Sequence, residues 1–506
     1  MATEISMSSP QRESAPLYRA AQVRELDRRA IQDHGIPGYT LMSRAAQASL
    51  SLLQARFPAA RKLAVFCGGG NNAGDGYALA RLAVCAGLEA QIIALKDPGQ
   101  LSGDAATAAR DALALGVSVE AWNGQAPEAD LIVDALFGTG LGRAVEGRYR
   151  EAIQAINGVD LPVLALDIPS GLQADTGAVL EVAVQADLTP TFIGRKLGLY
   201  TGRGPGLCGE VVFHDLGVPG AVYHGVEPAA RLYAGEDLPT RLAPRPRDAH
   251  KGHHGHVLVV GGDLGTGGAV RMAAEAAARV GAGLVSVATR MEHLAAVLSP
   301  RPELMVRGVE RAEELDSLLK RASVVAVGPG LGQGDWGRQL LARVLQYGLP
   351  MVVDADGLNL LAHNPVRRDD WVLTPHPGEA ARLLGASTGE VQADRFSAAD
   401  TLRSRFGGVC LLKGAGTLVT GADGNWLIHA GNPGMASGGM GDVLTGVIAG
   451  LLAQGLDTEA AARVGALVHG RAADLAARDG ERGILAGDLL APLRQLVNPA
   501  PGAPDR

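Results

Sequence analysis

The sequence predicts an α/β protein with two domains, each built on a doubly wound parallel sheet. The chain has 506 residues, which is too long for one ordinary hydrophobic core. Hydrophobic residues make up 47% and charged residues 20%, so the chain has enough apolar side chains for two cores. In both halves short apolar runs alternate with helical segments, which is typical of buried parallel strands joined by helices.

The elements follow one another in a regular order. Helical segments are expected at residues 20–33 and 40–55, separated by a Pro-Gly break, and later at 76–86 and 104–115. Buried strands are expected in the first half at 63–67, 90–95, 131–136 and 163–166. In the second half they are expected at 256–260, 283–288, 324–327, 351–353, 371–374 and 409–412. Few aromatic residues (4%) and many glycines (69) favour close packing of small-residue helices.

These elements divide the chain into five parts. Residues 1–17 are expected to be a disordered tail, and 18–216 the first domain. A segment rich in proline and glycine, 217–246, is interpreted as a linker. The second domain is expected at 247–497, and a loose Pro-rich tail at 498–506.

Charge and composition exclude several classes of protein. The formal net charge is −7 without long blocks of one sign, so we expect neither a nucleic-acid nor a membrane partner. The four cysteines form no CxxC pair, which favours buried free thiols over a disulfide framework or zinc site. The polar N-terminus lacks the apolar centre of a signal peptide, and 443–453 is too short to span a bilayer. A cytoplasmic enzyme is the default expectation.

Polar motifs follow three strands of the first half. The strand at 63–67 runs into GGGNNAGDG (68–76), Asp134 precedes GTGLG (138–142), and Asp167 opens DIPSG (167–171). In an open parallel sheet, ligands bind outside the carboxyl ends of the strands, where helix N-termini present free N–H groups. Each motif alone could be a tight turn or a capping aspartate. Their coincidence favours one shared site.

These motifs resemble the NAD(P)H-hydrate epimerase family over about residues 18–216, which implies a Rossmann-like domain. The resemblance implies that the hydrated nicotinamide nucleotide contacts Asp167 and two loops, comprising Asn71, Asn72, Ala73, Gly74, Asp75, Gly138, Thr139, Gly140, Leu141, Gly142, Arg143 and Ala144. It also implies a K⁺ ion held by Asn72, Asp134 and Ser170, whose oxygens suit a hard cation. Ala73 stands where the family usually has glycine, and we expect the loop to tolerate it unless that position needs a positive φ.

Epimerisation at C6 of the hydrated ring needs a proton donor and acceptor near one carbon. Asp167 is the candidate acid–base residue. Lys196 is a second candidate, within GRKLG (194–198), which is similar to a family segment although Leu197 replaces the usual proline. The alternative for a lone lysine after a strand is a solvated surface group.

The most distinctive motif is NPGMASGGMGD (432–442), which precedes a helical segment at 443–453. A glycine-rich turn that enters a helix presents N–H donors and a positive helix end to an anion. Asp442 beside such a turn suits a base that accepts a hydroxyl proton during phosphoryl transfer, and the alternative is an N-capping aspartate. Lys413 and Thr417, in KGAGT (413–417), could hold nucleotide phosphates. The Asp354-Ala-Asp356 segment adds carboxylates that could serve Mg²⁺.

Together with HGHVLVVGG (254–262), GPGLG (328–332) and TPHPGE (374–379), these segments resemble the ribokinase-like superfamily, and in particular its ADP- or ATP-dependent NAD(P)H-hydrate dehydratase branch, over about 247–496. The resemblance implies that the adenine nucleotide contacts Lys413, Gly414, Ala415, Gly416, Thr417 and Gly441, and that the hydrated cofactor contacts Ala269, Gly330, Gly332, His376 and Asp442.

The fused order implies a bifunctional metabolite-repair enzyme, with an isomerase and a lyase in one chain. It would epimerise (6R)- and (6S)-NAD(P)HX and dehydrate the S epimer with ADP, giving AMP and phosphate. Mg²⁺ and a homo-oligomeric state are also expected from the resemblance. The residues alone do not separate ADP from ATP, or NADHX from NADPHX.

Two alternatives stay open at this point. The second half could be a small-molecule kinase, for example of a vitamin precursor, with the first half as its regulator. The first half could instead be a degenerate binding module, although the joint presence of Asn72, Asp134, Asp167 and Ser170 argues against this. The histidine-rich run at 250–256 invites a metal interpretation, but it lies partly within a family segment.

Overall fold

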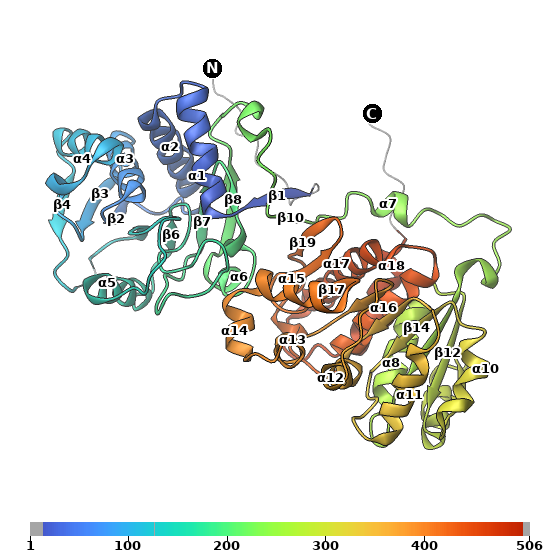
Figure 1. Ribbon diagram of the computed structural model, residues 1–506. Coiled ribbons are helices and arrows are strands. Elements are labelled where there is room, and N and C mark those ends of the chain that lie inside the picture. Colours follow the sequence, from blue (N-terminus) through green and yellow to red (C-terminus); the bar gives the residue numbers. More distant parts are fainter. Residues whose placement is uncertain (1–13, 126, 499–506) are drawn as a thin grey trace. The chain divides into compact units, whose positions relative to one another are not determined.

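The computed structural model describes residues 14–125 and 127–498 (Figure 1). The chain divides into two compact units, and the boundary between Ala230 and Arg231 falls inside the predicted linker. The predicted tail lies mostly outside the described residues, as does the C-terminal tail beyond residue 498. Residues 15–17 are an exception, because they belong to strand β1 (Ala15–Tyr18) and are therefore not loose.

The N-terminal unit contains a seven-stranded sheet in the order β4-β3-β2-β5-β6-β7-β9, and all its neighbouring strands are parallel. Its strands are β2 (Lys62–Cys67), β3 (Glu89–Ala94), β4 (Ser118–Ala121), β5 (Leu131–Ala135), β6 (Val163–Ala165), β7 (Leu188–Phe192) and β9 (Glu210–His214). The strand order reverses between β2 and β5, and such a switch point is where ligands bind in doubly wound sheets. β1 pairs in parallel with β8 (Arg195–Lys196) and does not belong to the seven-stranded sheet.

Helices cover both faces of this sheet. Leu63, Val65 and Cys67 of β2 pack into one apolar cluster with side chains of α2 (Gly38–Arg56), α3 (Asn71–Cys85) and α4 (Gly103–Ala114). Ala64 and Phe66 pack on the opposite face with α5 (Gly147–Asn157), as the alternation of side chains along a strand requires. A third cluster contains side chains of α1 (Ala20–Arg28). The unit also contains the short helix α6 (Gly204–Leu207).

The sheet of the C-terminal unit runs in the order β13-β12-β11-β14-β15-β16-β17-β18-β19-β10. Its strands are β10 (Ala230–Leu232), β11 (His256–Val260), β12 (Leu284–Thr289), β13 (Met305–Gly308), β14 (Val324–Val327), β15 (Met351–Val353), β16 (Trp371–Leu373), β17 (Val409–Leu412), β18 (Thr417–Gly421) and β19 (Gly424–Ile428). Pairing is parallel from β13 to β17 and antiparallel through β18 and β19. The six strands predicted for this half are confirmed.

Helices α8 (Gly267–Arg279) and α16 (Met440–Ala453) pack closely over this sheet. A Cβ added at Gly446 of α16 would lie 2.0 Å from the Ala273 carbonyl oxygen of α8, so only glycine permits this approach. The expected packing of small-residue helices is thus confirmed. The other helices are α7 (Leu238–Arg241), α9 (Leu294–Leu298), α10 (Asp316–Leu319), α11 (Asp335–Leu345), α12 (Ala355–His363), α13 (Pro377–Leu384), α14 (Thr388–Ala393), α15 (Arg395–Phe406), α17 (Thr458–Ala476) and α18 (Leu490–Leu496).

Several local predictions need correction. α3 begins at Asn71 and α16 at Met440, so residues 71–75 and 441–442 lie in first helical turns and not in the preceding loops. The predicted linker contains α7 and β10, which pairs with β19. Cys85 is exposed, whereas the other three cysteines are buried. Within the described part of the chain, no helix has the length and apolar character needed to cross a membrane.

Candidate functional site

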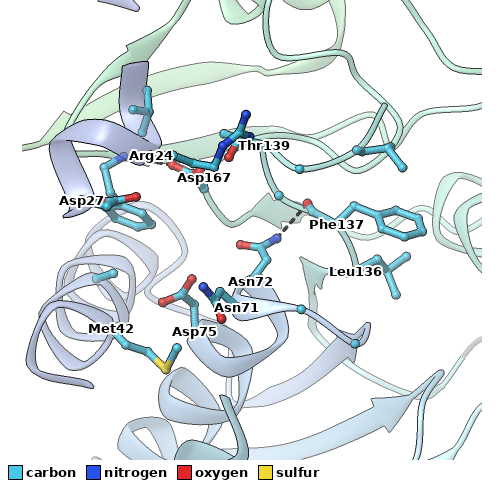
Figure 2. Close-up of a pocket in the computed structure, with 18 of the residues that line it drawn as sticks. Arg24, Asp27, Met42, Asn71, Asn72, Asp75, Leu136, Phe137, Thr139 and Asp167 are labelled. Atoms are coloured by element: carbon cyan, nitrogen blue, oxygen red, sulfur yellow. Dashed lines mark hydrogen bonds between the residues drawn. The ribbon is translucent and has the colours of Figure 1, made fainter. Parts of the chain in front are cut away.

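The three polar segments predicted to converge in the N-terminal unit line one cavity of about 1230 Å³ (Figure 2). The predicted residues that line it are Asn71, Asn72, Asp75, Gly138, Thr139, Gly140, Leu141, Gly142, Arg143, Ala144, Asp167 and Lys196. Ala73 and Gly74 are absent from this lining: Ala73 is part of the hydrophobic core, and a Cβ at Gly74 would meet the Met42 side chain. Ala73 has no positive φ, so the helix accepts it as expected.

Asp167 and Lys196 form an ion pair at the cavity wall. Asp167 follows β6 with a left-handed φ of 69°, and its Oδ1 accepts from the ammonium of Lys196. The Lys196 side chain is fully buried, and its Nζ also lies 3.0 Å from Thr191 Oγ1 and 3.1 Å from the Phe192 carbonyl oxygen. The alternative of a solvated surface lysine is therefore wrong. Burial of the ammonium against one carboxylate fixes the position of both groups.

Asp27 of α1 also lines this cavity, and the sequence analysis missed it. Burial raises its pKa to about 6, although Lys196 opposes the shift, and the negative charge of Asp167 adds to it. The pKa of Asp75 is raised as well, first by burial and then by the charges of Asp167 and Asp27. A signal for Asp27 existed: it lies four residues after Val23, on the buried stripe of an amphipathic helix, where a carboxylate is unusual.

Beside the cavity, Asn72, Asp134 and Ser170 come together as predicted. Ser170 donates from Oγ to Asp134 Oδ1 (2.6 Å) and from its backbone N–H to Oδ2 (2.7 Å). Asn72 donates from Nδ2 to the Phe137 carbonyl oxygen (2.9 Å; Figure 2), but its buried Oδ1 has no hydrogen-bond partner within the described residues. Burial raises the pKa of Asp134 to about 6. The backbone of Phe137 links Asn72 to the Asp134–Ser170 pair, because the Phe137 N–H donates to Ser170 Oγ at 2.8 Å. An unpaired buried amide oxygen and a buried carboxylate are groups that suit a hard cation.

The predicted dehydratase residues Lys413, Gly441 and Asp442 meet around Asp354, which follows β15. Lys413 Nζ lies 2.7 Å from Asp354 Oδ1 and 3.8 Å from Glu379 Oε2. A Cβ at Gly441 would lie 3.2 Å from the same Nζ, so the first turn of α16 passes beside this ammonium.

Burial and the neighbouring charges together set the pKa of Asp442. Burial, together with the negative charges of Asp354 and Glu379, raises the pKa of Asp442 to about 7, while Lys413 opposes the rise. Burial acts to lower the pKa of Lys413, but Asp354 and Glu379 outweigh it and hold that pKa above its ordinary value. The site therefore combines a permanent cation with a carboxylate that exchanges its proton near neutral pH, as a general base requires.

A buried arginine shapes the turn from Lys413 to Thr417. The guanidinium of Arg395, on α15, donates to the carbonyl oxygens of Leu412, Lys413 and Gly416 at 3.2–3.3 Å. A Cβ at Gly414, whose φ is 138°, would lie 2.7 Å from Arg395 Nη1. These three carbonyl oxygens therefore point toward the buried Arg395 side chain. Sequence reasoning missed this residue because it lies 18 residues before the turn.

The other predicted contacts occupy turns and helix starts. Thr266 Oγ1 donates to the Gly330 carbonyl oxygen (2.8 Å) and so links that turn to α8, which carries Ala269 in its first turn. His376 caps α13, with its Nδ1 accepting from the Gly378 N–H (2.9 Å), and its side chain is 56% exposed.

The carboxylates of Asp354 and Asp356 have separate partners. Asp356 accepts from the Gly332 N–H at 2.9 Å, whereas Asp354 contacts Lys413 and accepts from Thr445 Oγ1 at 2.8 Å. Each carboxylate thus has its own partners, and their expected role as Mg²⁺ ligands stays a prediction. In the histidine-rich run, His256 is buried and contacts Ser286 Oγ, which is a structural role.

Comparisons with known proteins agree with both halves of this description. Residues 257–494 match the family model described as NAD(P)H-hydrate dehydratase, and residues 38–198 match the one described as YjeF-related protein N-terminus. The chain is 51% identical over 490 residues to the bifunctional NAD(P)H-hydrate repair enzyme Nnr of Coxiella burnetii, covering 96% of this chain and 99% of that protein. It is 47% identical to the protein of the same description from Escherichia coli, covering 96% of this chain and 94% of that one.

Among solved structures, the chain is similar to an ADP/ATP-dependent NAD(P)H-hydrate dehydratase from Bacillus subtilis, co-crystallised with ATP/Mg²⁺. The identity is 29% and the TM-score 0.48, with 52% of this chain and 96% of that chain covered. The full-length relatives favour hydrate repair over both alternatives, the vitamin-precursor kinase and the degenerate N-terminal module.

Proposed function

The chain belongs to the bifunctional NAD(P)H-hydrate repair enzymes, and on that premise we propose how its residues divide the work. The N-terminal cavity interconverts the (6R) and (6S) hydrates of NADH and NADPH, with Asp167 and Lys196 at the reacting carbon. The C-terminal site dehydrates the S epimer, with ADP as phosphate donor and AMP and phosphate as products. Both activities are needed because water adds to either face of the ring, whereas a chiral site accepts one epimer.

In the dehydratase, Asp442 takes the proton of the C6 hydroxyl, and the oxygen attacks the terminal phosphorus of the adenine nucleotide. The bond to the nucleotide breaks, and a phosphate ester forms at C6. The ring nitrogen lone pair then expels phosphate, and loss of a C5 proton restores the dihydronicotinamide. Phosphorylation converts a poor leaving group into a good one.

The surrounding residues support these steps. Lys413 places a positive charge beside Asp442 and Gly441, where it would offset the charge of the transferring phosphoryl group. The N-terminal turn of α16 adds its free N–H groups and positive helix end. The turn from Lys413 to Thr417 would hold the nucleotide phosphates. A Mg²⁺ ion carried by the nucleotide would neutralise further phosphate charge.

We also propose that Asn72, Asp134 and Ser170 hold K⁺ in the epimerase domain. The unpaired Oδ1 of Asn72 supports this assignment, because a buried amide oxygen without a partner costs free energy that a cation would recover. The bound cation would organise the wall of the cavity from which Asn72 projects.

One observation carries the proposed dehydratase chemistry: Asp442, with a pKa of about 7, lies beside the Lys413–Asp354 pair in a glycine-rich helix start. The test supplies mixed-epimer NADHX with ADP or ATP and follows the absorbance of regenerated NADH. The parent chain should convert all the substrate, Asp167→Asn only one epimer, and Asp442→Asn none. Full conversion by Asp442→Asn would refute its assignment as the base.

A further inference from the structure

The α1 helix contributes one carboxylate to the epimerase cavity. Val23 and Leu26 of α1 are buried in the apolar cluster beneath the helix, and Asp27, next along the chain, lines the cavity. Figure 2 shows Asp27 entering the cavity from α1, while Asp75 enters from α3. Asp167 follows β6, so these three carboxylates reach the cavity from three separate elements.

These carboxylates differ in their partners. Asp167 is paired with the buried ammonium of Lys196 and also accepts from the Phe192 N–H at 3.1 Å. Asp27 has no hydrogen-bond or ion-pair partner within residues 14–125 and 127–498, although it interacts electrostatically with both Asp167 and Lys196. Asp27 is thus close to the pair but not part of it, and it is free to exchange a proton with a ligand.

The reaction needs two proton-transfer groups, because hydroxyl leaves one face of C6 and water returns to the other. Burial raises the pKa of Asp27 to about 6, so this group releases and accepts protons near neutral pH.

We propose that Asp27 is a second acid–base residue of the epimerase site and acts from a different wall of the cavity than Asp167. This inference rests on the proposed function of the N-terminal domain and extends its list of catalytic residues.

The proposed step balances as follows. Protonated Asp27 donates its proton to the C6 hydroxyl, the C6–O bond breaks with its electron pair on oxygen, and water leaves. The ring nitrogen lone pair forms the N1=C6 bond of an iminium ion. Water then adds to the opposite face, the electron pair returns to nitrogen, and Asp167 takes the proton of the entering water. The reverse epimerisation exchanges the two roles.

The test compares Asp27→Asn, Asp27→Glu and the control Glu25→Gln in the full chain. Glu25 lies on the same helix and carries similar charge, but it pairs with Arg28 and Arg29 and does not line the cavity. Purified epimers are incubated without nucleotide, and their interconversion is followed by chromatography. We expect Asp27→Asn to lower kcat by about 100-fold or more with KM changed less than about threefold. Asp27→Glu should keep part of the activity, and Glu25→Gln all of it.

The outcomes separate this inference from the proposed function. A parent chain that does not interconvert the epimers would refute the epimerase assignment itself. An active parent together with a fully active Asp27→Asn, or one that changes only KM, would overturn the role of Asp27 alone. Conversion of the S epimer with ADP in the same preparations reports on the C-terminal unit. If Asp27→Asn does not fold, Asp27→Ala with added formate decides: recovery of kcat supports the proposal, and no recovery overturns it.

Discussion

Replacing Asp442 by asparagine should abolish dehydration and at the same time stabilise the C-terminal unit above neutral pH. The rise of its pKa from the ordinary value of 3.8 to about 7 means that the folded site disfavours the ionised carboxylate. Each pKa unit corresponds to about 1.4 kcal/mol, so at pH 8 the ionised group costs of order 4 kcal/mol. Asparagine has nearly the same shape and no charge, and it removes this cost.

The raised pKa of Asp442 also determines how the free energy of unfolding changes with pH. Between the unfolded and folded pKa values the folded chain binds more protons, so its free energy of unfolding falls as pH rises. The stabilising effect of Asp442→Asn should therefore be absent near pH 4, grow between pH 4 and about 7, and stay constant above pH 7.

Urea titrations from pH 4 to 8, followed by tryptophan fluorescence, measure this difference. Trp336, Trp371 and Trp426 belong to the C-terminal unit and Trp122 to the other, so the signal reports mainly on the relevant unit. A difference between parent and variant that does not change with pH would refute the reasoning, because a pH-independent effect would come from packing and not from ionisation.

Three further changes test other parts of the structure. Arg395→Met should raise KM for ADP by about tenfold with little change in kcat, because the carbonyl oxygens of the 413–417 turn lose the hydrogen bonds that Arg395 donates. Steady-state kinetics in which kcat fell and KM stayed unchanged would contradict this positioning role. Ala73→Gly should lower the free energy of unfolding of the N-terminal unit by about 1 kcal/mol, since glycine loses more backbone entropy than alanine in a helix and leaves out a buried methyl group; a more stable variant in urea titrations would contradict the helical assignment. Potassium chloride, compared with tetramethylammonium chloride, should raise the melting temperature of the parent N-terminal unit by about 2 °C or more but not that of Asn72→Leu; an equal shift in both would place the cation elsewhere.

The elements and strand-end motifs could be predicted because their signals are local. A short apolar run such as 324–327 is buried on both faces, and glycine-rich turns such as 68–70 allow the close approach that follows a strand. The hairpin formed by β18 and β19 was missed. Its strands are short and separated by Ala422 and Asp423, so no helix marks the connection as it does between parallel strands.

Three residues of the candidate sites could not be placed from their local sequence. Arg395 holds a turn 18 residues away, and nothing in its helix indicates that partner. Lys196 has the local sequence of a surface lysine, but in the fold it belongs to β8, is fully buried and pairs with Asp167. The helical periodicity of α1 predicts that Asp27 faces inward. It cannot predict the cavity, because that cavity is formed by segments from the rest of the domain.

The two candidate sites share an electrostatic arrangement although their folds differ. In each, a lysine neutralises one carboxylate: Lys196 pairs with Asp167, and Lys413 pairs with Asp354. In each, a second carboxylate lies near that pair without a hydrogen-bond or ion-pair partner among the described residues, and burial raises its pKa toward neutrality: Asp27 in one site and Asp442 in the other.

The arrangement has a physical reason. Two ionised carboxylates in a partly desolvated site repel each other, and without a cation one of them would be held protonated too strongly to act as a base. A nearby lysine limits that shift, because its positive charge opposes the effects of burial and of the like charge on the second carboxylate. The lysine thus keeps the unpaired carboxylate in the range where it both accepts and releases a proton. Proton transfer at C6 of a hydrated nicotinamide ring requires this range in epimerisation and in dehydration alike.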